Sequence, residues 1–263
     1  MCSSDLIVRY RTTTADYSQK IAGGDVQFSL HRDWLGLSND VVYGLSGSLT
    51  STSRLRDRWE VNSATGVVTR TFSGDVYPNK LFPDTDVTQL AVFAQDTVRY
   101  GALRLIPALR LDYWHLEPSS DQALLNSSAS PVLPQTHVAL SPKLGASWDL
   151  DDTWRLVAQY SRGFRAPPYD SANFAYSNPA FGYQILPNAA LRPETSDGFE
   201  AGVRAGFADG SSARVTAFYN RYHDFIDTQV VGTSGGLTQY QYRSEEHTSE
   251  LQSPCNLVCR LLL

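Results

Sequence analysis

The feature that most constrains the fold is the order of the connections between stretches in which apolar and polar residues alternate. Alternation with period two indicates β-strands, because successive side chains of a strand point to opposite faces of its sheet. This pattern predicts ten strands along almost the whole chain. They cover residues 7–14, 25–34, 39–53, 87–99, 102–115, 137–149, 153–163, 196–207, 212–223 and 237–242.

The connections between these predicted strands alternate strictly between long and short. Long ones are expected at 15–24, 54–86, 116–136, 164–195 and 224–236, and short ones at 36–38, 100–101, 150–152 and 208–211. In an up-and-down antiparallel sheet, every second connection lies at the same end. All long loops are therefore expected at one end of the sheet and all tight turns at the other, which is the layout of an outer-membrane barrel.

The two faces of the predicted strands support a membrane setting. In 39–53, Val41, Tyr43 and Leu45 share one face, and Ser46 and Ser48 lie on the other. Lipid outside and a wet lumen inside require such a division. Several strands exceed ten residues, which is long for a soluble sheet and right for a tilted spanning strand. We predict an all-β, antiparallel up-and-down transmembrane β-barrel; a soluble sandwich or propeller is the alternative.

Other classes of protein find little support in the sequence. No window of 18 consecutive apolar residues is present, so no transmembrane helix is expected. The net charge of −5, without a basic cluster, predicts no nucleic-acid binding. No Ser/His/Asp set, phosphate-binding glycine loop or pair of catalytic carboxylates stands out, so we expect no enzyme.

The ten predicted strands are fewer than the roughly 22 of plugged outer-membrane transporters. We therefore interpret 7–242 as a partial barrel, an internal piece of a larger one. The pattern breaks off in 1–6 and 243–263, which resemble translated sequencing adapters, and we predict that both ends are non-native. All three cysteines, Cys2, Cys255 and Cys259, fall in these ends, so no metal or redox site is expected from them.

The connection 164–195 is the best candidate for a functional loop. It is rich in Asn, Pro and aromatic residues, and it is far longer than the 2–5 residues that a hairpin needs. It begins with the motif Phe164, Arg165, Ala166 and Pro167. Near its end it carries Asn188 and Leu191, followed by Arg192, Pro193, Glu194, Thr195 and Ser196.

These motifs resemble those of the TonB-dependent outer-membrane receptors, and within them the haem and haemoglobin receptors. That family has a Phe-Arg-Ala-Pro box at the end of one strand and an Asn-Pro-Asn-Leu box before the next. Here the first box is intact, and the second keeps Asn188 and Leu191 while Ala189 and Ala190 replace Pro and Asn. The run 192–196 with Glu200, and the strand sequence 90–96, are also typical of the wider superfamily.

The resemblance implies a receptor in the outer membrane of a Gram-negative bacterium that imports haem or iron, with 164–195 as an extracellular ligand-binding loop. Haem would be the transported ligand and not a prosthetic group. The implied partners are haem or a haem protein, the membrane lipid, and the TonB complex, which would act through a plug domain absent from this chain. The alternatives are a siderophore or cobalamin receptor, a passive porin or adhesin barrel, and a soluble β-protein with a binding loop.

In that family, the segment between the boxes supplies an axial ligand to haem iron, a His in many members and a Tyr in some. This segment has no histidine but has Tyr169, Tyr176 and Tyr183. Tyr183 is our predicted ligand, because Pro179 and Gly182 favour a turn that would present it. Phe174 and Phe181, with Tyr176, would cover the porphyrin. The other interpretation is that these aromatic residues only pack the loop, or that the ligand is a different iron chelate.

Overall fold

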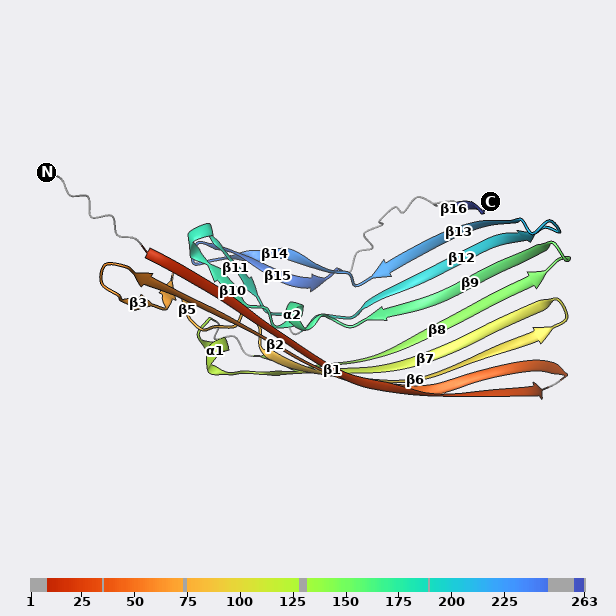
Figure 1. Cartoon of the computed structure of the whole chain (residues 1–263), viewed down its shortest axis with the longest axis horizontal. Coiled ribbons are helices and arrows are strands. Elements are labelled where there is room, and N and C mark those ends of the chain that lie inside the picture. The colour runs from red at the N-terminus through yellow and green to blue at the C-terminus, as the bar shows by residue number, and fades with distance from the viewer. Residues whose placement is uncertain are drawn as a thin grey trace.

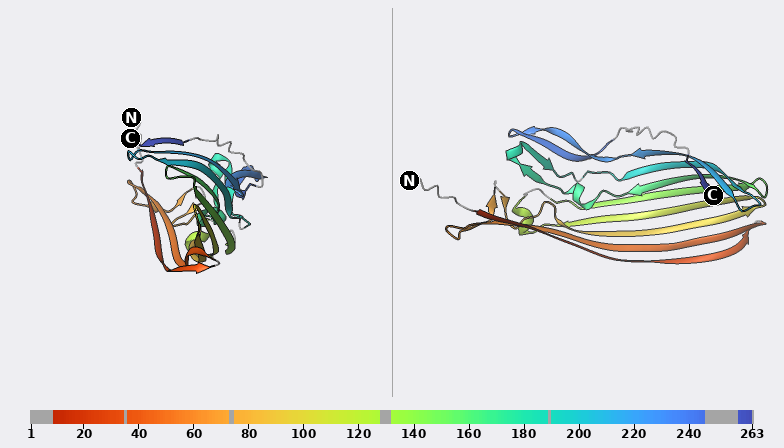
Figure 2. Two further views of the ribbon diagram at one scale, coloured as in Figure 1. Left: turned by 90° about the vertical axis from the view of Figure 1, so that its right-hand side faces the viewer. Right: turned by 45° about the horizontal axis from the view of Figure 1, so that its top comes forward.

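The protein is built on one antiparallel sheet that curves into an open half cylinder. A computed structural model describes residues 9–34, 36–72, 75–127, 132–188 and 190–245, and the backbone alone of 258–262. Strands neighbour one another in the order β1-β2-β6-β7-β8-β9-β12-β13-β16 (Figure 1). Figure 2 shows the curvature of this wall from its end. The order of the wall strands follows the sequence, so the predicted up-and-down architecture of a partial barrel is confirmed.

The wall strands are long, and their bounds are β1 (Arg9–Trp34), β2 (Leu37–Asn62), β6 (Asp84–Tyr100), β7 (Leu103–Ser119), β8 (Gln135–Asp149), β9 (Trp154–Arg165), β12 (Glu194–Gly206), β13 (Ser212–His223) and β16 (Val258–Leu262). Smaller elements are β3 (Val68–Thr69), which pairs with β2, the hairpin β4 (Thr71–Phe72) and β5 (Asp75–Val76), and the short helices α1 (Gln122–Leu125), α2 (Tyr169–Ala172) and η1 (Pro179–Phe181). No helix in the described part of the chain is long and apolar enough to cross a membrane.

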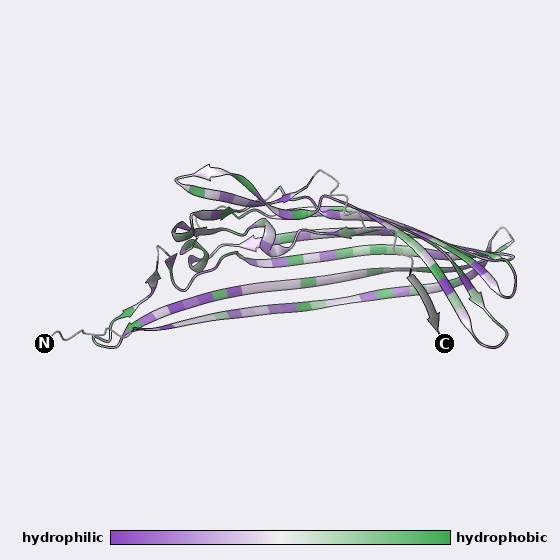
Figure 3. Ribbon diagram, turned by 90° about the horizontal axis from the view of Figure 1, so that it is seen from above, coloured by the Kyte–Doolittle hydropathy of each residue, from purple (hydrophilic) through white to green (hydrophobic). Residues whose placement is uncertain are grey.

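Hydrophobic and hydrophilic residues follow one another along much of the wall (Figure 3), and successive residues of a strand point to opposite faces of the sheet. Leu45, Leu49 and Leu90 are exposed on one face, although each is large and apolar. Ser48 and Gln89 lie on the other face, where they line a hollow. In a soluble protein, a second layer of helices or strands would cover such an apolar face. In a membrane barrel, this face contacts lipid.

The connections of the wall follow the predicted pattern between residues 36 and 211. The turns that join β1 to β2, β6 to β7, β8 to β9 and β12 to β13 are short and lie together at one end of the sheet (Figure 1). Gly101 and Gly210 have φ of 57° and 86° in two of these turns, a left-handed conformation that glycine adopts without strain. The long connections 63–83, 120–134 and 166–193 lie at the opposite end, which we call the loop end.

The prediction of a long loop at 15–24 is wrong, because these residues belong to β1. Strand β1 pairs with β2 without interruption from Arg9 opposite Asn62 to Trp34 opposite Leu37. At about 3.3 Å per residue, 26 paired residues extend roughly 86 Å, far beyond an apolar band of about 25 Å. The polar half of β1 therefore projects past the band, and the backbone ladder holds it extended without apolar alternation.

The prediction that 237–242 is a wall strand is also wrong. β15 (Leu237–Ser244) pairs antiparallel with β14 (Ile226–Ser234) and parallel with β11 (Tyr183–Leu186), which pairs in turn with β10 (Tyr176–Asn178). These four strands form a second sheet at the loop end (Figure 1). The predicted loop 224–236 is thus mostly β14, and the alternation in both strands reflects packing between two loops.

A non-native end is not expected to extend the sheet. Val258–Leu262 does extend it, since β16 pairs antiparallel with β13, with Thr216 opposite Val258 and Ser212 opposite Leu262. Strand β15 also continues to Ser244, past the predicted boundary at 243. Residues 1–8, 246–257 and 263 of these ends lie outside the described residues. That 1–6 and 243–263 are non-native stays a prediction.

A charge cluster lies under the loops, where the buried Lys80 joins two of them. Its side chain is 6% exposed, and its Nζ lies 2.7 Å from Asp84 Oδ2 and 2.6 Å from Asp121 Oδ2. Asp121 also caps α1, because its Oδ1 accepts the N–H of Leu124 at 2.9 Å. Burial alone would raise the pKa of Asp121, but hydrogen bonds from Lys80 and from backbone N–H groups outweigh burial and lower it. The charge cluster of Lys80, Asp84 and Asp121 therefore ties the 63–83 connection to the 120–134 connection.

Replacing Lys80 with Met should release these two loops from one another. We expect a local loss of about 1–3 kcal/mol, below the range for a fully buried pair because the two carboxylates are 37% and 46% exposed. Hydrogen exchange at the amides of Lys80 and Leu124 would measure it, with the exposed Lys20→Met as control. Unchanged exchange in Lys80→Met would mean that backbone contacts alone hold the loops.

The same cluster predicts how the loops respond to pH. The pKa of Asp121 is lowered from 3.8 in the folded protein. The contribution of its carboxylate to loop stability is therefore fully present above about pH 3.8 and is lost as the pH falls through the lower, folded pKa. For Lys80, burial would lower the pKa, but the hydrogen bonds to Asp121 and Asp84 outweigh burial and raise it above 10.5. The contribution of Lys80 to loop stability is therefore fully present below about pH 10.5 and is lost as the pH rises through its folded pKa, which lies above 10.5.

Candidate functional site

The central loop 164–195 folds into a small hairpin that presents Tyr183. Strands β10 and β11 are antiparallel, with Asn178 opposite Tyr183. Between them lies η1, and Gly182 ends it with a φ of 71° while its N–H donates to the carbonyl of Pro179 at 3.2 Å. The turn predicted at Pro179 and Gly182 is thus present, and Tyr183 is the first residue after it. The role of Tyr183 as an iron ligand stays a prediction.

Three tyrosines meet on this hairpin and its neighbour. The ring of Tyr183 lies 5.9 Å from that of Tyr176, centroid to centroid, and 6.2 Å from that of Tyr240 at an interplanar angle of 87°. Tyr240 belongs to β15. It lies near Tyr183 because β15 pairs parallel with β11, with Tyr240 opposite Ile185. We call Tyr176, Tyr183 and Tyr240 the tyrosine triad. The sequence patterns missed Tyr240, since they assigned its segment to the barrel wall.

Phe174 lies beside the triad and connects it to the loop core. Its ring is 6.5 Å from Tyr176, nearly parallel at 14°, and 6.4 Å from both Tyr242 and Phe82. Tyr242 and Phe82 come from two other connections, so no motif within the central loop indicated them. Phe174, placed by the sequence beside the ligand, is therefore held by aromatic rings from three segments.

Phe181 differs from the other predicted site residues. It lies on η1 at the tip of the hairpin and is 80% exposed. Among the described residues, its ring takes part in none of the aromatic contacts that join the triad and Phe174. The structure therefore brings Phe174, Tyr176 and Tyr183 together and leaves Phe181 apart from them.

Tyr169 occupies a different place, at the base of the central loop. It begins α2, and its ring meets Phe82 edge-on at 5.3 Å. Burial, reinforced by the negative charge of Asp170, raises the pKa of Tyr169 to about 12. A tyrosine binds iron through its deprotonated oxygen, so this environment disfavours Tyr169 as a ligand.

The two sequence boxes fasten the loop to its surroundings. Arg165 Nη1 donates to Glu194 Oε2 at 2.9 Å, which closes the base of the loop between β9 and β12. Asn188 donates from its Nδ2 to the carbonyl of Tyr242 at 2.8 Å and from its backbone N–H to that of Ala172 at 2.8 Å. Leu191 and Pro167 are fully buried. These motif residues hold the loop against β15 and α2, which positions the triad.

A hollow of about 840 Å³ lies below the loop on the polar face of the wall. Its lining includes Phe164, Arg165, Ala166, Pro167 and Tyr169 together with polar side chains of the wall. Tyr183 is not among its lining residues. The hollow and the tyrosine triad are therefore two separate places at the loop end.

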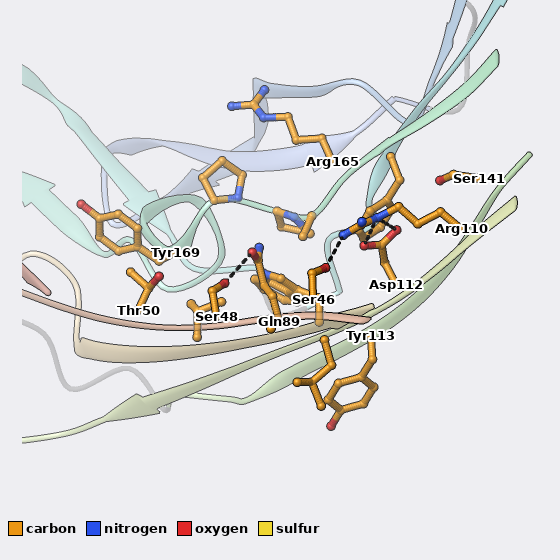
Figure 4. A pocket seen from close by; sticks show the side chains of 18 of the residues that line it. Ser46, Ser48, Thr50, Gln89, Arg110, Asp112, Tyr113, Ser141, Arg165 and Tyr169 are labelled. Atoms are coloured by element: carbon orange, nitrogen blue, oxygen red, sulfur yellow. Dashed lines mark hydrogen bonds and ion pairs between the residues drawn. The ribbon is translucent and has the colours of Figure 1, made fainter. Parts of the chain in front are cut away.

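A hydrogen-bonded row of wall side chains forms the floor of this hollow (Figure 4). Arg110 Nε pairs with Asp112 Oδ1 at 2.8 Å, and Arg110 Nη2 donates to Ser46 Oγ at 3.3 Å. Ser48 Oγ donates to Gln89 Oε1 at 3.2 Å. In the described part of the chain, no group of three or more His, Cys, Asp and Glu side chains is arranged to hold a bare metal ion.

Comparison with known families places the chain in a defined context. A family model described as "TonB dependent receptor-like, beta-barrel" matches residues 3–249. The chain is 31% identical over 100 residues to the Hemoglobin-haptoglobin utilization protein B of Neisseria meningitidis. This match covers 38% of this chain and 12% of that protein. It is 34% identical over 86 residues to the Iron-regulated outer membrane virulence protein of Vibrio cholerae, covering 33% and 13%. The chain thus spans only a small part of these relatives.

Solved structures show the same fold at low sequence identity. The ferric enterobactin receptor PfeA of Pseudomonas aeruginosa matches with a TM-score of 0.58 and 23% identity, over 88% of this chain and 32% of that one. The Serratia marcescens hemophore receptor HasR, solved with its hemophore and heme, matches with a TM-score of 0.53 and 15% identity, over 90% and 46%. Both likenesses support the partial-barrel fold alone.

Proposed function

Because the chain belongs to the TonB-dependent receptor β-barrel family, we propose that it carries part of the barrel wall and the ligand-binding loops of a receptor that imports haem iron. Proteins of this family reside in the outer membrane of Gram-negative bacteria, and they are receptors and transporters rather than enzymes. Haem is the transported ligand in this proposal, and a haem protein is its donor. Energy for transport comes from the TonB complex.

The observation that carries the proposal is the tyrosine triad, in which Tyr176 and Tyr183 of the central loop meet Tyr240 of β15. Within the described residues, the hydroxyl of Tyr183 makes no hydrogen bond, whereas that of Tyr176 accepts one from Asn178 Nδ2 at 3.1 Å. A free phenol has a pKa of ~10. A ferric ion supplies the driving force for deprotonation when the oxygen binds it, and tyrosinate is a known haem ligand. Phe174 and Tyr176 provide ring faces beside that oxygen.

The names of the relatives support haem as the cargo. Several of them, from Neisseria and Haemophilus, are described as using or binding hemoglobin and hemoglobin-haptoglobin. The matches cover about a third of this chain, so haem specificity remains our proposal. A ferric siderophore is the second candidate, because the hollow below the loop offers polar groups such as those of Ser48, Gln89 and Arg110. A passive porin or adhesin barrel is not supported, since the family match is to receptors.

The test is a titration of the full-length receptor that carries this chain, purified in detergent. Haemin should bind with a change in the Soret band, whereas iron-free protoporphyrin, which lacks the metal for Tyr183, should bind more weakly. Binding of a ferric siderophore without any haemin response would contradict the proposal and favour the second candidate.

A further inference from the structure

A row of arginines crosses the wall at the end opposite the loops. Arg155 of β9 lies directly opposite Arg204 of β12, which lies directly opposite Arg214 of β13. These three and Arg104 of β7 line one hollow of about 320 Å³, together with Glu200. Each of the four is near a short turn, because Arg104 and Arg155 are the second residues of their strands and Arg204 is two residues from the end of β12. We call these four residues the arginine row.

Neighbouring carboxylates balance only part of the charge of the arginine row. Like charges directly opposite each other on adjacent strands destabilise a sheet. Asp149 pairs with Arg155 and also attracts Arg104, but within the described residues neither Arg204 nor Arg214 has an ion pair. The Nε of Arg104 is buried without a hydrogen-bond partner. Four guanidinium groups therefore share a hollow whose lining holds a single carboxylate, that of Glu200.

The side of the wall on which the row lies indicates what it binds. The arginine row alternates with apolar residues such as Leu156 and Val203, which belong to a separate apolar hollow on the opposite face. It shares its face with the polar residues that line the large hollow at the loop end, and so it faces the lumen. A lipid headgroup at the outer surface does not reach it. Guanidinium groups bind carboxylates through paired, planar hydrogen bonds, and a cluster of one charge raises the local concentration of opposite charges.

We propose that the arginine row binds the carboxylate groups of the transported iron chelate inside the lumen, near the turn end of the barrel. For haem these groups are the two propionates. The proposal rests on the proposed function, because it requires an iron chelate that passes through this lumen. It adds a second binding place, at the opposite end of the wall from the tyrosine triad, that recognises the organic acid rather than the metal.

The test compares binding with uptake in the full-length receptor. The double variant R204Q/R214Q is the probe, and R221Q, on the other face of β13 opposite Asp197, is the matched control. We expect R204Q/R214Q to keep the haemin affinity seen in the Soret band but to lower the initial rate of haemin uptake by cells severalfold. Uptake of haemin dimethyl ester, which lacks the carboxylates, should be the same in all three receptors. If the double variant does not reach the outer membrane, R214Q against R221Q makes the same comparison.

Two results would overturn the proposal. Haemin uptake at the unchanged rate in R204Q/R214Q would show that the row binds no cargo. Equal slowing of haemin and its dimethyl ester would show that the row holds acidic side chains of the receptor itself. If the unchanged receptor gives no Soret response to haemin, the proposed function fails separately. Uptake of ferric citrate, a carboxylate chelate, then decides: slower uptake in R204Q/R214Q supports the row, and equal uptake rejects it.

Discussion

The full-length receptor carrying Tyr183→Phe is expected to bind ferric haem about 10–100-fold more weakly than the unchanged receptor, by analogy with the loss of supporting groups at metal sites. Phenylalanine keeps the ring that contacts Tyr176 and Tyr240 and removes only the oxygen. The hairpin should therefore keep its shape, since Gly182 and the ladder of β10 and β11 are untouched. Haemin titration followed in the Soret band would measure the change in affinity.

Two matched variants decide which tyrosine is the ligand. Tyr176→Phe removes a hydroxyl that Asn178 already binds, and the ring can still stack on Phe174. Tyr169→Phe removes a hydroxyl whose pKa is raised to about 12 by burial, and should change affinity least. The donor at Asn178 would also stabilise a phenolate on Tyr176. If Tyr176→Phe alters the spectrum and Tyr183→Phe does not, the ligand is Tyr176; if none of the three matters, the siderophore candidate is favoured.

The second large effect is expected on the outward face of the wall. Leu140 lies in the middle of β8, opposite Leu111 of β7, and is 52% exposed. Leu140→Arg would place a charge against lipid. It should destabilise the folded barrel in the membrane by about 2–4 kcal/mol if the site lies near the bilayer midplane. Urea titration of the full-length receptor refolded in lipid vesicles would measure it.

Ala139→Arg is the control for this substitution, one residue away on the same strand. Its side chain points to the opposite face, where Asp112 lies directly across on β7. An arginine there meets water and a carboxylate, so we expect little change in the free energy of folding. Equal losses in Leu140→Arg and Ala139→Arg would contradict the assignment of the two faces.

How far the sequence determined this protein depends on the range of the interactions involved. Alternation in segments such as 39–53 and 87–99 predicted wall strands, because it reflects the two environments of each strand and is written in neighbouring residues. The lengths of the connections placed the long loops at one end. Pro179 and Gly182 predicted the turn before Tyr183, because a turn depends on a few consecutive backbone conformations.

Only the tertiary structure decided which segments from different connections meet. The polar half of β1 carries no apolar alternation, and its extended form comes from pairing with β2. Strand β15 alternates like a wall strand, and only its ladder to β11 brings Tyr240 to Tyr183. The arginine row likewise exists through register, which aligns Arg155, Arg204 and Arg214 across three strands. Local propensity acts along the chain, whereas these contacts form across it, where the free energy of pairing depends on partners tens of residues away.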